Sequence, residues 1–106
     1  MNEKNEILVR TRSSIGMLAS MLEVPNDNWE EKKIRLIKDK FIKKINLKFK
    51  KKGSLSYPFS HFNLSAEIFF ATINKKKFPD QKWLKLSKYN SSQLPTVMKK
   101  IVNQAI

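Results

Sequence analysis

The sequence predicts a mainly α-helical fold, a small single-domain bundle of four to five helices over residues 1–106, with a possible short β-hairpin around residues 45–59. Apolar residues recur at spacings of three and four along several segments, which is the period of an amphipathic helix. A chain of 106 residues suits one compact domain, and hydrophobic residues make up 41%, which is enough to build a core. There is no cysteine, which excludes a disulfide framework and a thiolate zinc site.

The first element is predicted as a near-neutral helix within residues 1–24. No proline interrupts residues 3–24, and Pro25 ends the segment because the residue before a proline disfavours helical dihedral angles. The apolar stripe of this helix comprises Leu8, Ile15, Leu18 and Leu22, widened by Met17 and Met21.

A basic helical body is expected over residues 27–106, and its first helix starts at Asp27 or Asn28. Either residue can cap a helix, and an acidic first turn suits the helix dipole. The helical spacing continues through Ile34, Ile37, Phe41 and Ile45. Apolar and polar residues then alternate, so residues 45–59 either extend this helix or form a basic hairpin that turns at KKKGS. We favour a helix to about the middle of this stretch.

Three further helices complete the predicted bundle. Residues 65–77 read as one helix, which Phe78 and Pro79 end, and Asp80 can start a short helix after it. The last helix begins near Ser92 or Pro95. Its amphipathic stripe consists of Leu94, Val97, Met98, Ile101, Val102 and Ala105.

The distribution of charge indicates binding to a polyanion. Lys and Arg number 22 against nine Asp and Glu, which gives a net charge of +13. Residues 1–31 carry three basic and six acidic side chains, whereas the rest carries 19 basic and three acidic ones. Such clustered cations favour nucleic acid, and a predominance of lysine suggests contact with phosphates at low sequence specificity.

The candidate nucleic-acid-binding residues are therefore mostly lysines, with DNA favoured over RNA. For any single lysine, a solvated helix face is the simpler explanation. Trp83 lies between two lysines and is the aromatic residue that we would test first for stacking on bases. The full set is Arg10, Arg12, Lys32, Arg35, Lys40, Lys43, Lys44, Lys48, Lys50, Lys51, Lys52, Lys75, Lys76, Lys77, Lys82, Trp83 and Lys85.

The sequence offers little that points to catalysis, so we expect a non-enzyme without a metal or other cofactor. His61 is the only histidine, and two glycines are too few for a glycine-rich phosphate loop. No stretch is apolar enough to cross a membrane, and we expect a cytoplasmic protein. The first helix packs in the core or serves as a face for a protein partner or a homodimer. The residues of that face are Met17, Leu18, Met21 and Leu22.

The segment TRSSIGMLASMLEVPNDNW, from Thr11 to Trp29, resembles small plasmid-mobilisation accessory proteins of the MobC/TraD type. The resemblance extends over residues 11–45 and rests on a basic start, an apolar helix that contains Gly16, and a polar linker. It implies a helical, non-enzymatic DNA-binding accessory protein with a part in conjugation or mobilisation, in a plasmid or phage nucleoprotein complex. The alternatives are an adaptor or inhibitor that docks on an acidic protein, and an RNA-binding or ribosome-associated protein.

Overall fold

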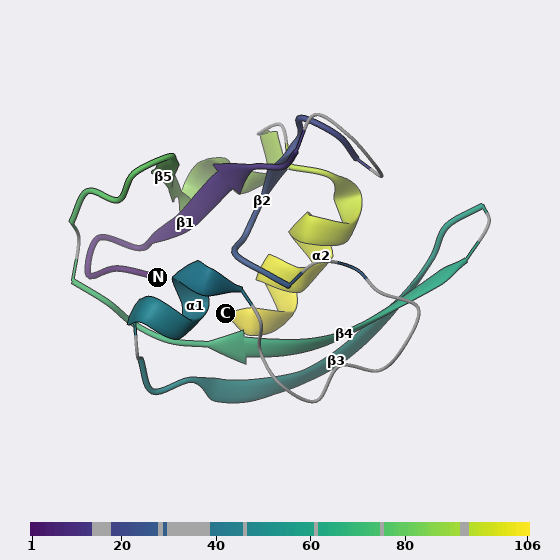
Figure 1. Cartoon of the computed structure of the whole chain (residues 1–106), viewed down its shortest axis with the longest axis horizontal. Coiled ribbons are helices and arrows are strands. Elements are labelled where there is room, and N and C mark those ends of the chain that lie inside the picture. The colour runs from purple at the N-terminus through teal and green to yellow at the C-terminus, as the bar shows by residue number, and fades with distance from the viewer. Residues whose placement is uncertain are drawn as a thin grey trace.

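The computed structural model describes residues 1–13, 18–27, 29, 39–45, 47–60, 62–74, 76–91 and 94–106, apart from the side chains of Lys40 and residues 89–91. Within these ranges the chain forms five strands, two α-helices and one 3-10 helix (Figure 1). The strands make a three-stranded and a two-stranded antiparallel sheet. The predicted bundle of four to five helices is therefore wrong, and the protein is mostly β.

The first sheet has the strand order β2–β1–β5. Its central strand is β1 (Glu6–Thr11), flanked by β2 (Leu22–Glu23) and by β5 (Gln81–Lys85). In the register, Arg10 lies opposite Glu23 on one side and Gln81 on the other. Residues 6–11 form a strand in which Ile7, Leu8 and Val9 pair with β5, so the helix predicted within residues 1–24 is wrong.

The second sheet is a hairpin of β3 (Lys50–Pro58) and β4 (Asn63–Phe70). The turn lies at residues 59–62, where the backbone N–H of Phe59 donates to the carbonyl of Phe62 over 2.7 Å. The helix favoured to about the middle of residues 45–59 is wrong, because α1 ends at Ile45 and β3 starts at Lys50. The alternative, a hairpin, is right in that the alternation after Gly53 belongs to a strand, but the hairpin does not turn at KKKGS. The helix predicted over residues 65–77 is wrong too, because its first six residues continue β4.

A bulge interrupts the hairpin at Gly53. The register shifts between Lys51 and Ser54, so β3 has one residue more than β4 at this point. Gly53 has a φ of +103°, which side-chain-bearing residues rarely adopt. The Gln104 amide donates to the carbonyls of Lys52 and Ser54 over 3.2 and 3.1 Å, and it stands 2.9 Å from the position of a Cβ on Gly53.

The helices are short except for the last one. Helix α1 (Lys40–Ile45) and the 3-10 helix η1 (Leu86–Ser91) have six residues each, and α2 (Thr96–Ala105) has ten. The predicted last helix is confirmed, including its buried stripe of Val97, Met98 and Val102. Helix α1 lies within the predicted second helix, of which residues 30–38 are outside the described residues. The short helix expected from Asp80 is instead β5 followed by η1.

Helix α2 lies between the two sheets (Figure 1). One side packs on the first sheet, and the main core consists of Ile7, Val9, Leu22, Leu94, Val97, Met98 and Val102. The other side contacts both strands of the hairpin. The polar and aromatic side chains of the candidate site come mainly from β1, from the loop after β2 and from the turn of the hairpin. No helix among the described residues is long and apolar enough to span a membrane.

Candidate functional site

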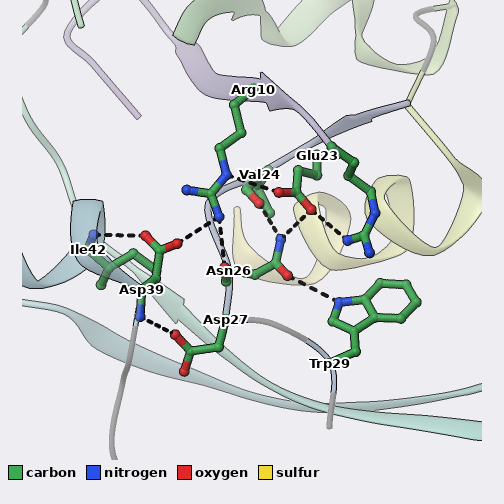
Figure 2. A network of polar contacts seen from close by, with 9 residues as sticks. Arg10, Glu23, Val24, Asn26, Asp27, Trp29, Asp39 and Ile42 are labelled. Carbon is green, nitrogen blue, oxygen red and sulfur yellow. Dashed lines mark hydrogen bonds and ion pairs between the residues drawn. The ribbon is translucent and has the colours of Figure 1, made fainter. Parts of the chain in front are cut away.

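Arg10, near the end of the central strand β1, is the centre of a polar network (Figure 2). Its Nε donates to Glu23 Oε2 over 2.9 Å, and its Nη2 donates to Asp39 Oδ1 and to the Asn26 carbonyl over 2.8 Å each. Burial disfavours the charge on Arg10, but the hydrogen bonds to both carboxylates outweigh burial and raise its pKa above the ordinary value. The guanidinium therefore joins β1 to the loop after β2 and to the start of α1.

Asp39, which accepts a hydrogen bond from Arg10, also caps helix α1. Its Oδ2 accepts from the backbone N–H of Ile42 over 3.0 Å, and its own N–H donates to Asp27 Oδ1 over 2.6 Å (Figure 2). Burial favours the neutral carboxyl, but hydrogen bonds from Arg10 and Ile42 outweigh it and lower the pKa of Asp39. Asp39 is thus charged at neutral pH and fixes the first turn of α1 against the sheet.

Glu23 accepts from a second arginine and from an amide. Arg12 Nη1 lies 2.6 Å from Glu23 Oε1, and Asn26 Nδ2 donates to the same oxygen over 3.0 Å. Arg10 lies on β1 and Arg12 follows directly after this strand, and both reach the same carboxylate. Glu23 is only 6% exposed, so the two guanidinium groups compensate a buried negative charge.

Trp29 connects this network to a cluster of aromatic rings. Its Nε1 donates to Asn26 Oδ1 over 3.1 Å, and the Arg12 guanidinium carbon lies 4.3 Å from the centre of its ring. The Trp29 ring is 5.8 Å from Phe59, with an angle of 42° between the planes. The indole is therefore held at its edge by an amide and on one face by a cation.

Four rings form what we call the aromatic cluster, and Phe59 contacts each of the other three. The cluster consists of Trp29, Tyr57, Phe59 and Phe62. Tyr57 meets Phe59 edge to face, with ring centres 5.0 Å apart. Phe62, across the turn, stacks on Phe59 at 5.0 Å and 23° and remains 39% exposed. Lys100 of α2 places its Nζ 6.0 Å from the Tyr57 ring centre, so the cluster has a cation on two sides, Arg12 and Lys100.

A second group of aromatic rings surrounds Trp83, the residue singled out from the sequence. Its Nε1 donates to the Lys76 carbonyl over 2.9 Å, and its ring lies 6.4 Å from Phe78. Phe78 in turn meets Phe41 of α1 edge to face at 5.2 Å. Trp83 is half-buried, and Phe78 links its ring to that of Phe41 on α1.

The sequence-predicted lysines are divided between the two sheets and α1. Lys43 and Lys44 are exposed at the end of α1, Lys50 and Lys51 are exposed on β3, and Lys48 is exposed before it. Lys52 stands 5.7 Å from the Phe70 ring, and Lys51 meets Glu67 at 3.5 Å. Exposed lysines of the other sheet and the segment before it are Lys76, Lys77, Lys82 and Lys85. Lys32, Arg35, Lys75 and the side chain of Lys40 lie outside the described residues.

The nucleic-acid-binding role of these cations stays a prediction. The protein-contact face of Leu18, Met21 and Leu22 stays one as well, although the helix that it assumed is absent. Leu22 is buried in the core, Leu18 packs against it, and Met21 is 36% exposed. Met17 lies outside the described residues.

Sequence reasoning missed Glu23, Asn26, Asp39 and Trp29 as parts of one site. A signal for Asp39 was present, because it is one of three acids after residue 31 and lies within a run of lysines. An isolated acidic residue among lysines is a candidate ion-pair partner for a basic residue that is buried in the fold. Recognition of residues 6–11 as a strand would also have placed Arg10 near its end and Arg12 directly after it.

In the comparison with protein families, residues 1–104 match the model of the NUDIX domain. Its fold is that of nucleotide-diphosphate hydrolases, and members of the family are typically hydrolases. No curated protein matches the chain. The resemblance of residues 11–45 to mobilisation proteins is therefore wrong.

The functions inferred from that resemblance and from net charge need correction as well. A non-enzymatic DNA-binding accessory role and a part in conjugation or mobilisation are both contradicted by the family, and neither alternative gains support. The error has a physical reason, because net charge constrains solubility and association but not the fold. The family match extends over residues 1–104 of 106, and the chain therefore belongs to the NUDIX family.

Proposed function

We propose that this NUDIX domain recognises a nucleoside diphosphate, or a compound that contains one, as its substrate. The base stacks on Phe62 of the aromatic cluster, and Lys100 attracts the phosphates. The family supports the substrate class, since its fold is that of nucleotide-diphosphate hydrolases. The single observation that carries the assignment to this site is the stack of an exposed Phe62 on Phe59, with cations on two sides of the cluster.

Phe62 is suited to stack on a base because its neighbours hold it on one side only. Phe59 covers one face of the ring at 5.0 Å, while 39% of the residue remains exposed to solvent. Phe59 itself packs against the core, so the platform beneath Phe62 is supported by the rest of the protein. Stacking of one base on an exposed aromatic ring contributes about 1–3 kcal/mol.

The phosphates need a cation whose charge is not already compensated. Arg12 is bound to Glu23 at 2.6 Å and covers Trp29, so its charge serves the network. Lys100 is exposed, and its Nζ lies 6.0 Å from the centre of the Tyr57 ring. An ammonium on a flexible stem binds phosphate as a point charge and adapts to its position.

The described carboxylates do not fit a Mg²⁺ site, although hydrolysis of diphosphates is commonly assisted by this ion. Among the described residues no three His, Asp or Glu side chains gather in a group that could hold a metal. Glu23, the carboxylate nearest to the aromatic cluster in the network, already accepts from two arginines. Glu30 and Glu31 lie outside the described residues.

Calorimetric titration with GDP tests the proposal, with inorganic pyrophosphate as a ligand that lacks the base. We expect Phe62→Ala to weaken GDP binding roughly 5- to 100-fold, because one stacking contact is lost. Pyrophosphate binding should be unchanged in this variant, and both ligands should bind less well to Lys100→Gln. The matched control is Phe69→Ala, since Phe69 is 41% exposed at the far end of the same hairpin.

A turnover assay accompanies the titration, because members of the family are typically hydrolases. Release of phosphate from GDP and GTP is measured with MgCl₂, and Phe62→Ala should raise KM for any nucleotide that is turned over. The proposal fails if the unaltered protein binds neither nucleotide, or if Phe69→Ala weakens GDP binding as much as Phe62→Ala does.

A further inference from the structure

The amide of Asn26 is locked by three hydrogen bonds. Its Nδ2 donates to Glu23 Oε1 over 3.0 Å and to the Val24 carbonyl over 2.7 Å. Its Oδ1 accepts from Trp29 Nε1 over 3.1 Å. A primary amide has two N–H donors, and here both are used, so the amide cannot rotate without breaking the contacts with β2.

Glu23, the main partner of that amide, is itself immobilised. It is 6% exposed and accepts from Arg10 and Arg12 as well as from Asn26. Charge-assisted hydrogen bonds of this kind are about twice as strong as neutral ones. Figure 2 shows Asn26 between Glu23 and Trp29, with its oxygen directed toward the indole nitrogen.

The indole of Trp29 is thereby constrained in two independent ways. The hydrogen bond to Asn26 fixes its edge, and the Arg12 guanidinium 4.3 Å from its ring centre covers one face. Arg12, Glu23, Asn26 and Trp29 form a closed circuit of contacts. A side chain held at both edge and face has a single orientation, and Trp29 lies against Phe59 at 5.8 Å in that orientation.

We propose that Asn26 is a positioning residue for the base platform, by which we mean the stacked rings of Phe59 and Phe62. This inference rests on the proposed function. By holding Trp29, it fixes Phe59, and Phe59 carries the exposed Phe62. Asn26 itself touches neither the base nor the phosphates in this arrangement. Its role is to prepare the stacking surface before the ligand arrives, which removes an ordering cost from binding.

A double-mutant cycle with GDP tests this role and separates it from general stability. The parent of the cycle is Trp83→Phe, in which Trp29 is the only tryptophan. The other three proteins add Asn26→Leu, Trp29→Phe or both to this parent. We expect Asn26→Leu to weaken GDP binding roughly 3- to 10-fold when Trp29 is present, and hardly at all in a Trp29→Phe background. Trp29→Phe alone removes only the indole donor and part of the ring, and it should weaken GDP binding by a similar factor. This variant tests the role of the Trp29 contact even if Asn26→Leu does not fold.

Two readouts complete the experiment. Pyrophosphate should bind equally to all four proteins, because the platform serves only the base. The Trp29 indole N–H should exchange with solvent faster in Asn26→Leu than in the parent, and the control Asn74→Leu, at an exposed residue, should change neither readout.

The outcomes distinguish this inference from the function beneath it. If the parent does not bind GDP, the proposed function and this inference both fail. If the parent binds GDP but Asn26→Leu weakens it equally with and without Trp29, the proposed function stands and the positioning role is refuted.

Discussion

Replacing Arg10 by methionine should destabilise the fold strongly at neutral pH. The substitution keeps much of the aliphatic stem and removes three hydrogen bonds, to Glu23, Asp39 and the Asn26 carbonyl. The Arg10 side chain is 20% exposed and that of Asp39 is 13% exposed, so both charges are largely shielded from water. Breaking a fully buried pair costs about 3–5 kcal/mol, and a hydrogen bond to a charged group contributes about 1.5–3 kcal/mol.

A loss of about 3 kcal/mol follows for this variant, toward the lower end of the range for a buried pair. Glu23 keeps Arg12 and Asn26, so Asp39 loses more from the substitution than Glu23 does. A small domain is stable by roughly 5–15 kcal/mol, so the variant should still fold. The assay is urea unfolding followed by circular dichroism at pH 7, with Lys77→Met as the control at an exposed cation.

The pH dependence of this difference provides a second check. The folded pKa of Asp39 lies below its ordinary value of 3.8, so its stabilising contribution is complete above that value. It is lost as the pH falls through the folded pKa, because the neutral carboxyl no longer pairs with Arg10. The difference between the wild type and Arg10→Met should therefore narrow below about pH 4. A loss under 1 kcal/mol at pH 7, or a difference that does not narrow in acid, would refute this reasoning.

Two further predictions concern the hairpin and the core. Gly53→Ala should cost about 1–3 kcal/mol in urea unfolding, because φ is +103° and a Cβ would stand 2.9 Å from the Gln104 amide nitrogen. The same substitution should cost less in a Gln104→Ala background, and an equal cost there would argue against the contact. Met98→Ala should lose about 2–5 kcal/mol, since Met98 is 1% exposed in the main core. A loss below 1 kcal/mol, measured by the same unfolding assay, would contradict the packing described for α2.

The sequence was informative where the structure is determined locally. Helix α2 was predicted with its buried stripe, because a regular period of 3.6 and a proline at the start are local signals. Strand β1 was missed because its stabilising partner, β5, lies more than 70 residues away in the sequence. Leu8, Leu18 and Leu22 match a helical spacing by coincidence, and only pairing between distant strands decides against it.

The hairpin and the site show the same limit. Alternation in β3 indicated a strand, but the hairpin weighed as an alternative placed its turn at Gly53, which instead occupies a bulge, and the strands are joined where Phe59 donates to the Phe62 carbonyl. Arg10 and Arg12 were selected as candidate nucleic-acid contacts, and in the structure their guanidinium groups donate to carboxylates of the chain itself. Their acidic partners lie 11 to 29 residues away in the sequence, so spacing alone could not identify them.

Because of the extra residue at Gly53, the odd- and even-numbered side chains of β3 exchange faces of the sheet at this point. Lys50, before it, shares a sheet face with Phe70, whereas Tyr57, after it, shares that same face with Leu64. Even-numbered side chains of β3 before the glycine thus lie on the same face of the sheet as odd-numbered ones after it. Deletion of this single glycine would leave a regular ladder in which Lys50 still pairs with Phe70 and Ser54 with Glu67, so Leu55 and Tyr57 would keep their face of the sheet and only the bulge would be lost.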